Sequence, residues 1–223
     1  MTNSFTLLEA TKWKDYALLD SGDGLKLERF GKYVFVRPES QAMWKRALTS
    51  EWNNADAVFI STGEESGGHW DVKKKVAEKW EMKYDLSLTP SPSTKGRGGI
   101  HFWAMTTPGR HLGVFPEVAS HWDFISDLIH QADSPPNVLN LFGYTGLATL
   151  AAASAGAKVT HVDASKKSVS WARENQALSQ LEEKPIRWIV DDALKFVQRE
   201  ARRGVKYDGI ILDPPKFGRG PKG

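Results

Sequence analysis

The sequence predicts an α/β fold in which a parallel sheet with helices follows a smaller β-rich domain. From residue 137 onward, short apolar runs alternate with longer helix-like stretches, and strands separated by helices are typical of βαβ units in a parallel sheet. Before about residue 115, short alternating runs are separated by Gly-rich turns, which is typical of antiparallel hairpins. We therefore expect a β-rich domain over residues 1–110 and an α/β domain over residues 111–223.

The β-rich domain should contain short strands bounded by turn residues. Five runs have this character: 16–19, 25–30, 33–36, 57–60 and 100–103. Residues 89–99 are rich in Pro, Ser and Gly, which is typical of a loop.

The α/β domain should begin with a helix, because Pro116 can open one and apolar residues then follow at helical spacing through Ile129. Strands are expected at 138–142, 158–162, 186–190 and 207–212, and helices at 146–155, 165–178 and 193–202.

The composition is that of a globular protein with a core: 223 residues, 40% hydrophobic and 26% charged. No apolar run reaches the roughly 18 residues of a membrane span, and the start lacks the apolar segment of a secretory signal. The absence of cysteine excludes disulfides and cysteine-ligated zinc and fits a cytoplasmic protein. We expect no metal site and no membrane partner.

The formal net charge of +3 is too small to indicate a nucleic-acid binder. Residues 137–223 are the basic part, with 14 Lys or Arg against 9 Asp or Glu, whereas residues 1–136 have 16 against 18. This asymmetry is compatible with an ordinary solvated surface and also with a mild attraction to phosphates.

Candidate site residues follow the predicted strands, because ligands of open parallel sheets bind outside the carboxyl ends of the strands. The first strand leads into N-L-F-G-Y-T-G, Asn140 to Gly146. Its two glycines allow a tight turn and a close approach to a ligand. The loop lacks the G-x-G-x-x-G pattern and, taken alone, is equally an ordinary strand-to-helix turn.

Carboxylates follow the second and third strands. Asp163 lies 17 residues beyond Gly146, where an acidic side chain can accept hydrogen bonds from two ribose hydroxyls. It could instead cap the next helix, although Ser165 competes for that role. Of Asp191 and Asp192, one can accept from an adenine amine and the other can cap the following helix; we favour Asp192 for adenine.

The fourth strand leads into D-P-P-K-F, from Asp213 to Phe217. Pro214 and Pro215 cannot extend the strand, because they lack N–H donors. Together with the Asp213 carboxylate, their carbonyl oxygens form an acceptor-rich rim suited to the N–H edge of a planar base, on which Phe217 could stack. Lys216 could meet a phosphate or be a solvated lysine.

This ordered series of motifs resembles the class I S-adenosylmethionine-dependent methyltransferases, with their Rossmann-like fold. It is most similar to the group that includes the 23S ribosomal RNA methyltransferases producing 5-methylcytosine or 7-methylguanine. The resemblance covers about residues 110–223. It implies S-adenosylmethionine as cofactor, RNA as the partner and a methylated base as the product.

The resemblance also implies roles for individual residues. Asn140, Phe142, Gly143, Tyr144, Thr145 and Gly146 match the loop that holds the methionine part of the cofactor. Asp163 and Ala164 match the ribose-binding position, and Asp191, Asp192 and Ala193 match the adenine side. Asp213, Pro214, Pro215 and Phe217 match the catalytic, substrate-facing motif.

The segment from His111 to Glu117 partly resembles the family's G-x-F-L-D-Q-R stretch near the cofactor, which makes Phe115 a candidate contact. Pro116 and Glu117 replace Leu and Asp, and Val118 and Ala119 replace Gln and Arg. The contacts that the Gln and Arg side chains make in the family are therefore not expected here.

Two departures from the family matter. The chain provides four strands where the family's sheet has seven, and it stops ten residues after Asp213, so we expect a piece of a longer parent with an exposed sheet edge. Methylation of cytosine carbon 5 also needs a cysteine nucleophile, which excludes that reaction for this chain acting alone.

Two other functions stay open. A non-catalytic cofactor- or RNA-binding remnant is the first alternative, because of the missing strands. An NAD-dependent oxidoreductase is the second, but the absent G-x-G-x-x-G pattern and the D-P-P-K-F run argue against it.

Overall fold

The computed structural model describes residues 7–48, 50–62, 67–86 and 99–215. The chain divides into two compact units that alternate along the sequence. Unit 1 comprises Met1–Thr11, Leu86–Phe102 and Glu117–Gly223, and unit 2 comprises Lys12–Asp85 and Trp103–Pro116.

Unit 1 is built on a four-stranded parallel sheet in the order β10-β9-β8-β11. Its strands are β8 (Asn137–Leu141), β9 (Lys158–Asp163), β10 (Ile186–Val190) and β11 (Gly209–Leu212). The chain runs outward from β8 to β9 and β10 and then returns to the other side of β8 with β11. The strand order therefore reverses between β8 and β11, which in open parallel sheets is the place where ligands bind.

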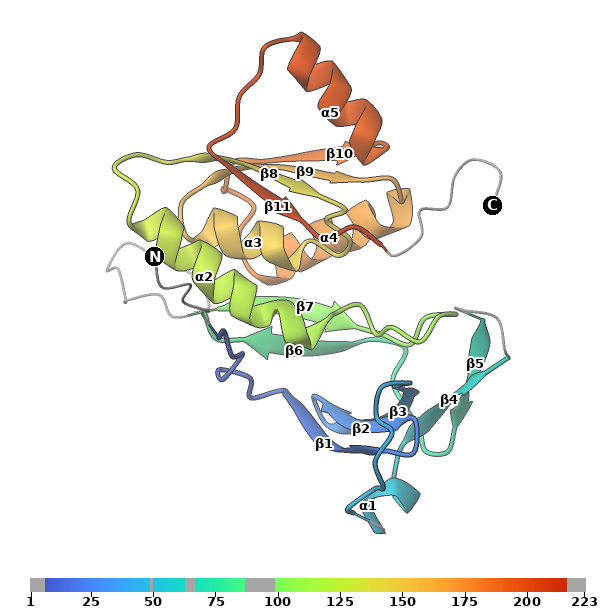
Figure 1. The fold of residues 1–223 in the computed structure, drawn as a ribbon. Helices are drawn as coiled ribbons and strands as arrows, with labels where there is room; N and C mark the ends of the chain where they lie inside the picture. Colours follow the sequence, from blue (N-terminus) through green and yellow to red (C-terminus); the bar gives the residue numbers. More distant parts are fainter. Residues whose placement is uncertain (1–6, 49, 63–66, 87–98, 216–223) are drawn as a thin grey trace, which may run out of the picture. The chain divides into compact units, whose positions relative to one another are not determined.

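Helices cover both faces of this sheet (Figure 1). They are α2 (Ala119–His130), α3 (Leu147–Ser154), α4 (Lys166–Leu178) and α5 (Ala193–Arg202). Figure 1 shows α3 and α4 on one face and α5 on the other, while α2 packs along α3. The α3 side buries Val138, Ala152 and Val159, and the α5 side buries Leu139, Val162 and Phe196.

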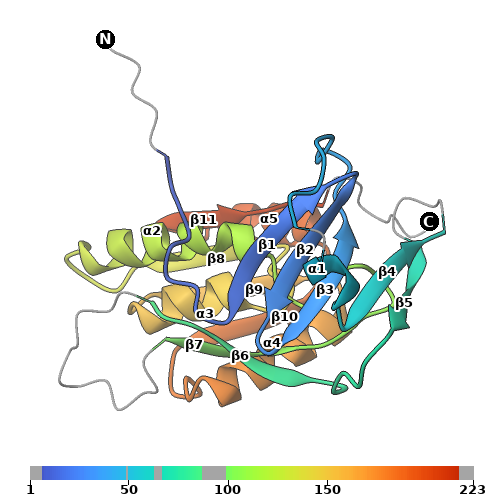
Figure 2. The same ribbon diagram turned by 90° about the horizontal axis from the view of Figure 1, so that it is seen from below.

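Unit 2 carries a five-stranded sheet in the order β1-β2-β3-β4-β5 (Figure 2). The strands are β1 (Tyr16–Gly22), β2 (Leu25–Phe30), β3 (Tyr33–Pro38), β4 (Ala57–Ser61) and β5 (Gly68–Val72), with the short helix α1 (Ser50–Asn53) between β3 and β4. All neighbours are antiparallel except β3 and β4. A two-stranded sheet joins β6 (Trp80–Tyr84) to β7 (Ile100–Ala104), and a 3-10 turn, η1, spans Pro116–Val118.

A buried ion pair lies within the β2–β3 hairpin of unit 2. Arg37 donates from Nε and Nη2 to the two oxygens of Glu28, at 2.7 and 2.8 Å, and both residues are almost fully buried. Tyr16 Oη also donates to Glu28. A paired and hydrogen-bonded charge of this kind is tolerated in a core, whereas removing one partner leaves a costly uncompensated charge.

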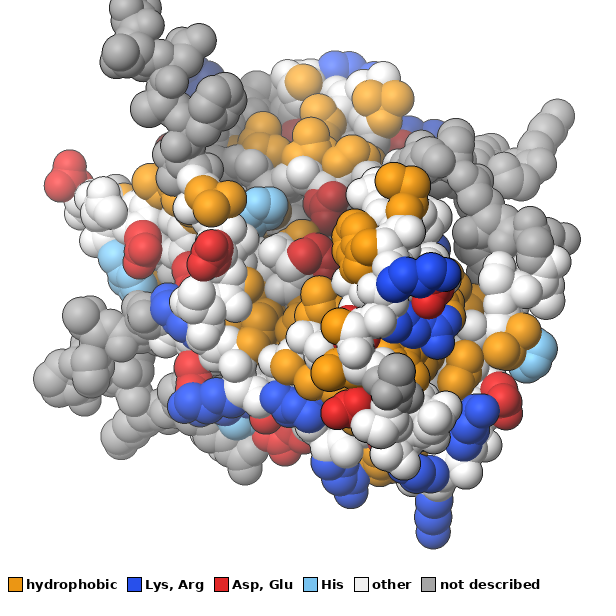
Figure 3. Space-filling model, turned by 60° about the horizontal axis from the view of Figure 1, so that its bottom comes forward, with side chains coloured by type: hydrophobic (Ala, Val, Ile, Leu, Met, Phe, Trp, Pro, Cys, Tyr) orange, Lys and Arg blue, Asp and Glu red, His pale blue; other side chains and the backbone are white. Residues whose placement is uncertain are grey.

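Exposed hydrophobic side chains are interspersed with charged ones on the face in Figure 3. In unit 2, the exposed apolar side chains include Leu18, Met43 and Trp44. Scattered exposure of this kind is ordinary for a folded protein. No helix in the described part of the chain is both long and apolar enough to span a membrane.

The structure confirms the parallel sheet with helices and the β-rich segment before it. The hairpin strands β1 to β3 and the strands of unit 1 occur within a few residues of the predicted places, although β11 begins at residue 209 rather than 207. The sequence-based prediction missed β5, β6 and α1. The predicted loop at 89–99 lies almost entirely outside the described residues, and the proposed boundary at residue 110 differs from the interleaved division into units.

Candidate functional site

The strand register brings the ends of β8, β9, β10 and β11 to one level. Leu141 pairs with Leu212 on one side and with Val162 on the other, and Val162 pairs with Ile189. The residues that follow these positions therefore share the carboxyl edge of the sheet. This edge carries the glycine loop, Asp163, the Asp191–Asp192 pair and Asp213.

The glycine loop has an unusual backbone. Phe142, Tyr144 and Gly146 have φ values of 56°, 48° and 83°. These values lie in the left-handed region, which residues other than glycine seldom adopt. Gly143 N donates to Val162 O at 3.1 Å, and Gly146 N donates to Gly143 O at 2.9 Å. The chain thus folds back over β9 before α3 begins, and Gly146 occupies the N-cap position of that helix.

Gly143 is required by a contact beneath the loop. A Cβ atom on this residue would lie 2.3 Å from His161 Cε1 and 2.5 Å from His161 Nδ1, far inside van der Waals contact. The ring cannot move away easily, because His161 is fully buried and packs against Trp188 with a centroid distance of 4.7 Å.

A buried polar network supports the same loop. Asn140 Nδ2 donates to Thr149 Oγ1 at 2.8 Å, and Thr149 Oγ1 lies 2.9 Å from His161 Nδ1. Burial lowers the pKa of His161 to about 3, so the ring is neutral at physiological pH. Its Nε2 is buried and has no hydrogen-bond partner among the described residues.

The side chain of Asn140, expected to contact a ligand, therefore lies in the interior and is only 3% exposed. Its partners Thr149 and His161 were not among the residues predicted from the sequence. Nor was Asn175 of α4, which is fully buried and donates from Nδ2 to Thr145 O at 2.9 Å. No clear signal pointed to His161, because β9 reads K-V-T-H-V-D and four of its six residues are polar or charged.

Asp163 holds the loop in place through its two carboxylate oxygens. Oδ2 accepts from Tyr144 N at 2.9 Å and Oδ1 accepts from Ser165 N at 2.8 Å. The cap of α4 is Ser165, whose Oγ accepts from Ser168 N at 3.1 Å, so Asp163 does not cap this helix. A carboxylate oxygen can accept more than one hydrogen bond, and partly exposed Asp163 keeps acceptor capacity for a ligand.

Asp191 and Asp192 take different structural roles. Asp192 is the N-cap of α5 and accepts from Lys195 N at 2.9 Å, which gives the capping role to the residue that we favoured for adenine. Asp191 pairs with Arg199, and the hydrogen bond from this guanidinium lowers the pKa of the Asp191 carboxyl. An adenine contact by either carboxylate stays a prediction, and Ala193 contributes its side chain to the core.

Asp213, Pro214 and Pro215 follow β11 and are exposed at the carboxyl edge, and Ala164 is exposed after β9. Phe217 and Lys216 lie outside the described residues. Phe115 belongs to unit 2, where its ring lies 4.7 Å from that of His111. The structure thus brings the predicted residues of β8, β9, β10 and β11 together and leaves the predictions for Phe115 and Phe217 without support from this edge.

The edge is acidic and rich in acceptors. Four carboxylates, of Asp163, Asp191, Asp192 and Asp213, lie at or just beyond the ends of three of its strands. Such a surface suits a ligand with hydroxyl and amino donors and a positive charge.

Comparisons with known proteins find both related sequences and similar structures. The family model described as "Conserved hypothetical protein 95" matches residues 123–219. The Ribosomal RNA large subunit methyltransferase K/L of Shewanella sp. (strain ANA-3) is 42% identical over 92 residues, which is 40% of this chain and 13% of the relative.

Two solved structures cover nearly the whole chain. The SAM-dependent methyltransferase from Agrobacterium tumefaciens is 49% identical with a TM-score of 0.84, over 97% of this chain and 65% of that protein. The structure of SMU.776, crystallised with S-adenosylhomocysteine, has a TM-score of 0.70 at 19% identity, over 95% of this chain and 55% of that protein. The chain thus spans about an eighth of the curated relative's length and about two thirds or less of the solved proteins.

Proposed function

We propose that this chain, a member of the class I S-adenosylmethionine-dependent methyltransferases by sequence and fold, binds S-adenosylmethionine at the carboxyl edge of β8–β11 and takes part in methyl transfer to RNA. The observation that carries the proposal is the strand register, which gathers the glycine loop, Asp163 and Asp213 at the point where the strand order reverses.

The residues at this edge fit the cofactor. S-adenosylmethionine carries a sulfonium cation, ribose hydroxyls and an adenine amine, and it supplies a methyl group on a good leaving group. Asp163 would accept hydrogen bonds from the ribose hydroxyls. The left-handed loop from Phe142 to Gly146, kept free of a Cβ at Gly143, would lie along the methionine part.

The protein's part in the reaction is alignment. Asp213 and the carbonyl oxygen of Pro214 would hold the N–H edge of the acceptor base, which orients it toward the methyl group and limits the access of water. Asp192 would reach the adenine side with the carboxylate oxygen that does not cap α5.

RNA as the acceptor is supported by the name of the Shewanella relative, a ribosomal RNA methyltransferase, and by the excess of basic residues over acidic ones in residues 137–223. A cytoplasmic location accords with a chain that lacks cysteine.

Transfer of a labelled methyl group from S-adenosylmethionine to unmodified large-subunit ribosomal RNA tests this proposal. The wild type should label the RNA, and Asp213→Ala should reduce the rate at least tenfold while Asp133→Ala, at an exposed loop position, leaves it unchanged. Cofactor binding without labelling of any RNA would favour the non-catalytic alternative over methyl transfer.

A further inference from the structure

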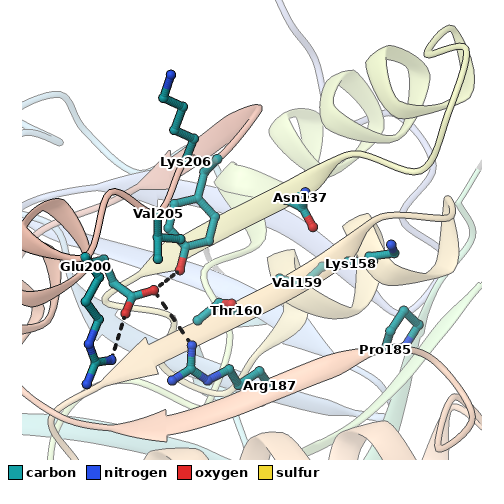
Figure 4. Close-up of a pocket in the computed structure, with 11 residues that line it drawn as sticks. Asn137, Lys158, Val159, Thr160, Pro185, Arg187, Glu200, Val205 and Lys206 are labelled. Carbon is teal, nitrogen blue, oxygen red and sulfur yellow. Dashed lines mark hydrogen bonds and ion pairs between the residues drawn. The ribbon is translucent and has the colours of Figure 1, made fainter.

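A second concave surface lies at the opposite, amino edge of the unit 1 sheet. It is a pocket of about 420 Å³ between the starts of β8, β9 and β10, the end of α5 and the segment before β11 (Figure 4). Four cationic side chains line it, Lys158, Arg187, Arg203 and Lys206, against the single carboxylate of Glu200. None of these residues takes part in the site at the carboxyl edge.

Glu200 organises the floor of the pocket. It is only 4% exposed and accepts from Tyr207 Oη at 2.8 Å and from Arg203 Nη1 at 3.3 Å. Arg187 Nη1 lies 3.7 Å from Oε2 of the same carboxylate group. The buried carboxylate thus pairs with both guanidinium groups, and each guanidinium has further N–H donors.

The other two cations of the pocket are the ammonium groups of Lys158 and Lys206. Figure 4 shows Arg187 turned toward Glu200, whereas Lys158 and Lys206 extend away from it. Within the described ranges, neither lysine has an ion-pair partner. The carboxylate of the neighbouring Asp208 accepts a hydrogen bond from Asn137 N at 2.8 Å.

Helix electrostatics alone do not explain this cluster. Cations near the C-terminal end of α5 interact favourably with the helix dipole, which accounts for Arg203. Lys158 comes from β9, Arg187 from β10 and Lys206 from the segment before β11, so three of the four cations have no such reason to converge.

We propose that this pocket binds phosphate groups of the RNA backbone, on the side of the sheet opposite the cofactor edge. Arginine forks and lysine ammonium groups are the usual partners of phosphate, through charge-assisted hydrogen bonds. The volume of about 420 Å³ exceeds that of one phosphate and leaves room for the attached ribose. The choice of RNA rests on the proposed function. Measuring RNA affinity apart from methyl transfer tests the pocket assignment separately from the proposed function.

The test is the affinity of the full chain for a fluorescent fragment of ribosomal RNA, measured by anisotropy without cofactor at several salt concentrations. The double variant Lys158→Ala/Lys206→Ala should bind roughly tenfold more weakly at low salt. The slope of log affinity against log salt should fall by about 1 to 2, as expected when one or two phosphate contacts are lost.

Two controls separate the pocket from general charge. Lys73→Ala/Lys75→Ala removes the same charge from exposed positions of unit 2 and should leave both affinity and slope unchanged. Lys158→Arg/Lys206→Arg keeps the cations at the rim and should retain binding. An equal loss of RNA affinity in both alanine double variants would overturn the proposal that the pocket is a specific phosphate site.

The source of the phosphate is decided by titration with inorganic phosphate and with adenosine monophosphate. If either binds the wild type while the alanine variant keeps full RNA affinity, the pocket serves a small anion and the RNA assignment is wrong. If the variant loses RNA binding but the wild type transfers no methyl group, the pocket assignment stands and the proposed function fails. Methyl transfer by the wild type, together with unchanged RNA affinity in the variant, would support the proposed function and overturn the pocket assignment.

Discussion

His161 lies beneath the glycine loop with no exposed surface, and its ring contacts Gly143 and Trp188. Burial lowers its pKa from 6.5 to about 3, so the unfolded chain binds a proton more readily than the folded one. The stability that this residue confers is fully present above about pH 6.5 and is lost as the pH falls toward 3.

We therefore expect acid to destabilise the fold through His161. Between pH 7 and pH 5, the free energy of unfolding should fall by roughly 2 kcal/mol from this residue alone. Urea denaturation at both pH values measures it in the wild type and in His161→Gln, whose side chain does not titrate. The free energy of unfolding of the variant should fall by about 2 kcal/mol less than that of the wild type over this interval. An equal fall in both proteins would show that His161 is not the source of the acid sensitivity. His111, whose pKa burial lowers to about 4, contributes to both proteins alike.

Gly143 should not tolerate a methyl group. Gly143→Ala places a Cβ on the buried His161 ring and should lower the free energy of unfolding by about 1–3 kcal/mol, the usual cost of overpacking. Gly209→Ala is the matched control, because its nearest neighbour would be Val138 Cγ2 at an ordinary 3.8 Å. Urea denaturation compares the two variants.

The contact with His161 can be tested directly. In a His161→Ala background the space opens, so the cost of Gly143→Ala should shrink. A cost that is the same in both backgrounds would show that the histidine ring is not what excludes the Cβ.

The positions and contacts of individual side chains were only partly predictable from the sequence. The place of Asp163 at the end of β9 and the cap at Ser165 follow from local signals, a carboxylate at the end of a predicted strand and a hydroxyl before a helix. The inward direction of Asn140 and the network with Thr149 and His161 were not predictable, because they depend on three elements that meet only in the folded unit.

At the scale of elements, α5 depends on its cap. The Asp192 carboxylate accepts the N–H of Lys195 at the start of the helix, where the dipole also favours negative charge. Asp192→Ala should lower the free energy of unfolding by about 1 kcal/mol, measured by urea denaturation. Asp192→Asn retains an acceptor oxygen and should cost only a few tenths.

The same pair of variants bears on the adenine prediction. If Asp192 also contacts adenine, Asp192→Asn should weaken cofactor binding although stability is kept. Unchanged affinity in a stable Asp192→Asn protein would shift the adenine prediction to Asp191.

The elements of unit 1 were predictable because apolar strands and helices alternate there with clear boundaries. In unit 2, β6 has the sequence Trp-Glu-Met-Lys-Tyr with alternating burial, so the period-two signal was present and was missed. The strand β5, Gly-His-Trp-Asp-Val, has no buried residue, so its apolar pattern is weak. Residues 68–72 form a strand because they pair antiparallel with β4. This pairing depends on the tertiary structure and not on the local sequence.

At the scale of the whole molecule, the sequence indicates two structural regions but not how they interleave. Residues 103–116 belong to unit 2 although they follow part of unit 1 along the chain. Such a division reflects contacts between distant segments, and no composition change near residue 110 reveals it. The class of fold was predictable because the motifs lie after successive strands. Recognising such a series requires only the order of strands and helices along the chain.

Calorimetric titration with S-adenosylmethionine measures whether the carboxyl edge of the unit 1 sheet binds this cofactor, as we propose. The wild type should bind with a stoichiometry of about one, and Asp163→Ala should weaken the affinity by about tenfold or more through loss of charge-assisted hydrogen bonds. Asp133→Ala should bind as the wild type does. A folded wild type that binds no cofactor, or an Asp163→Ala variant that binds as tightly as the wild type, would contradict the assignment of this edge.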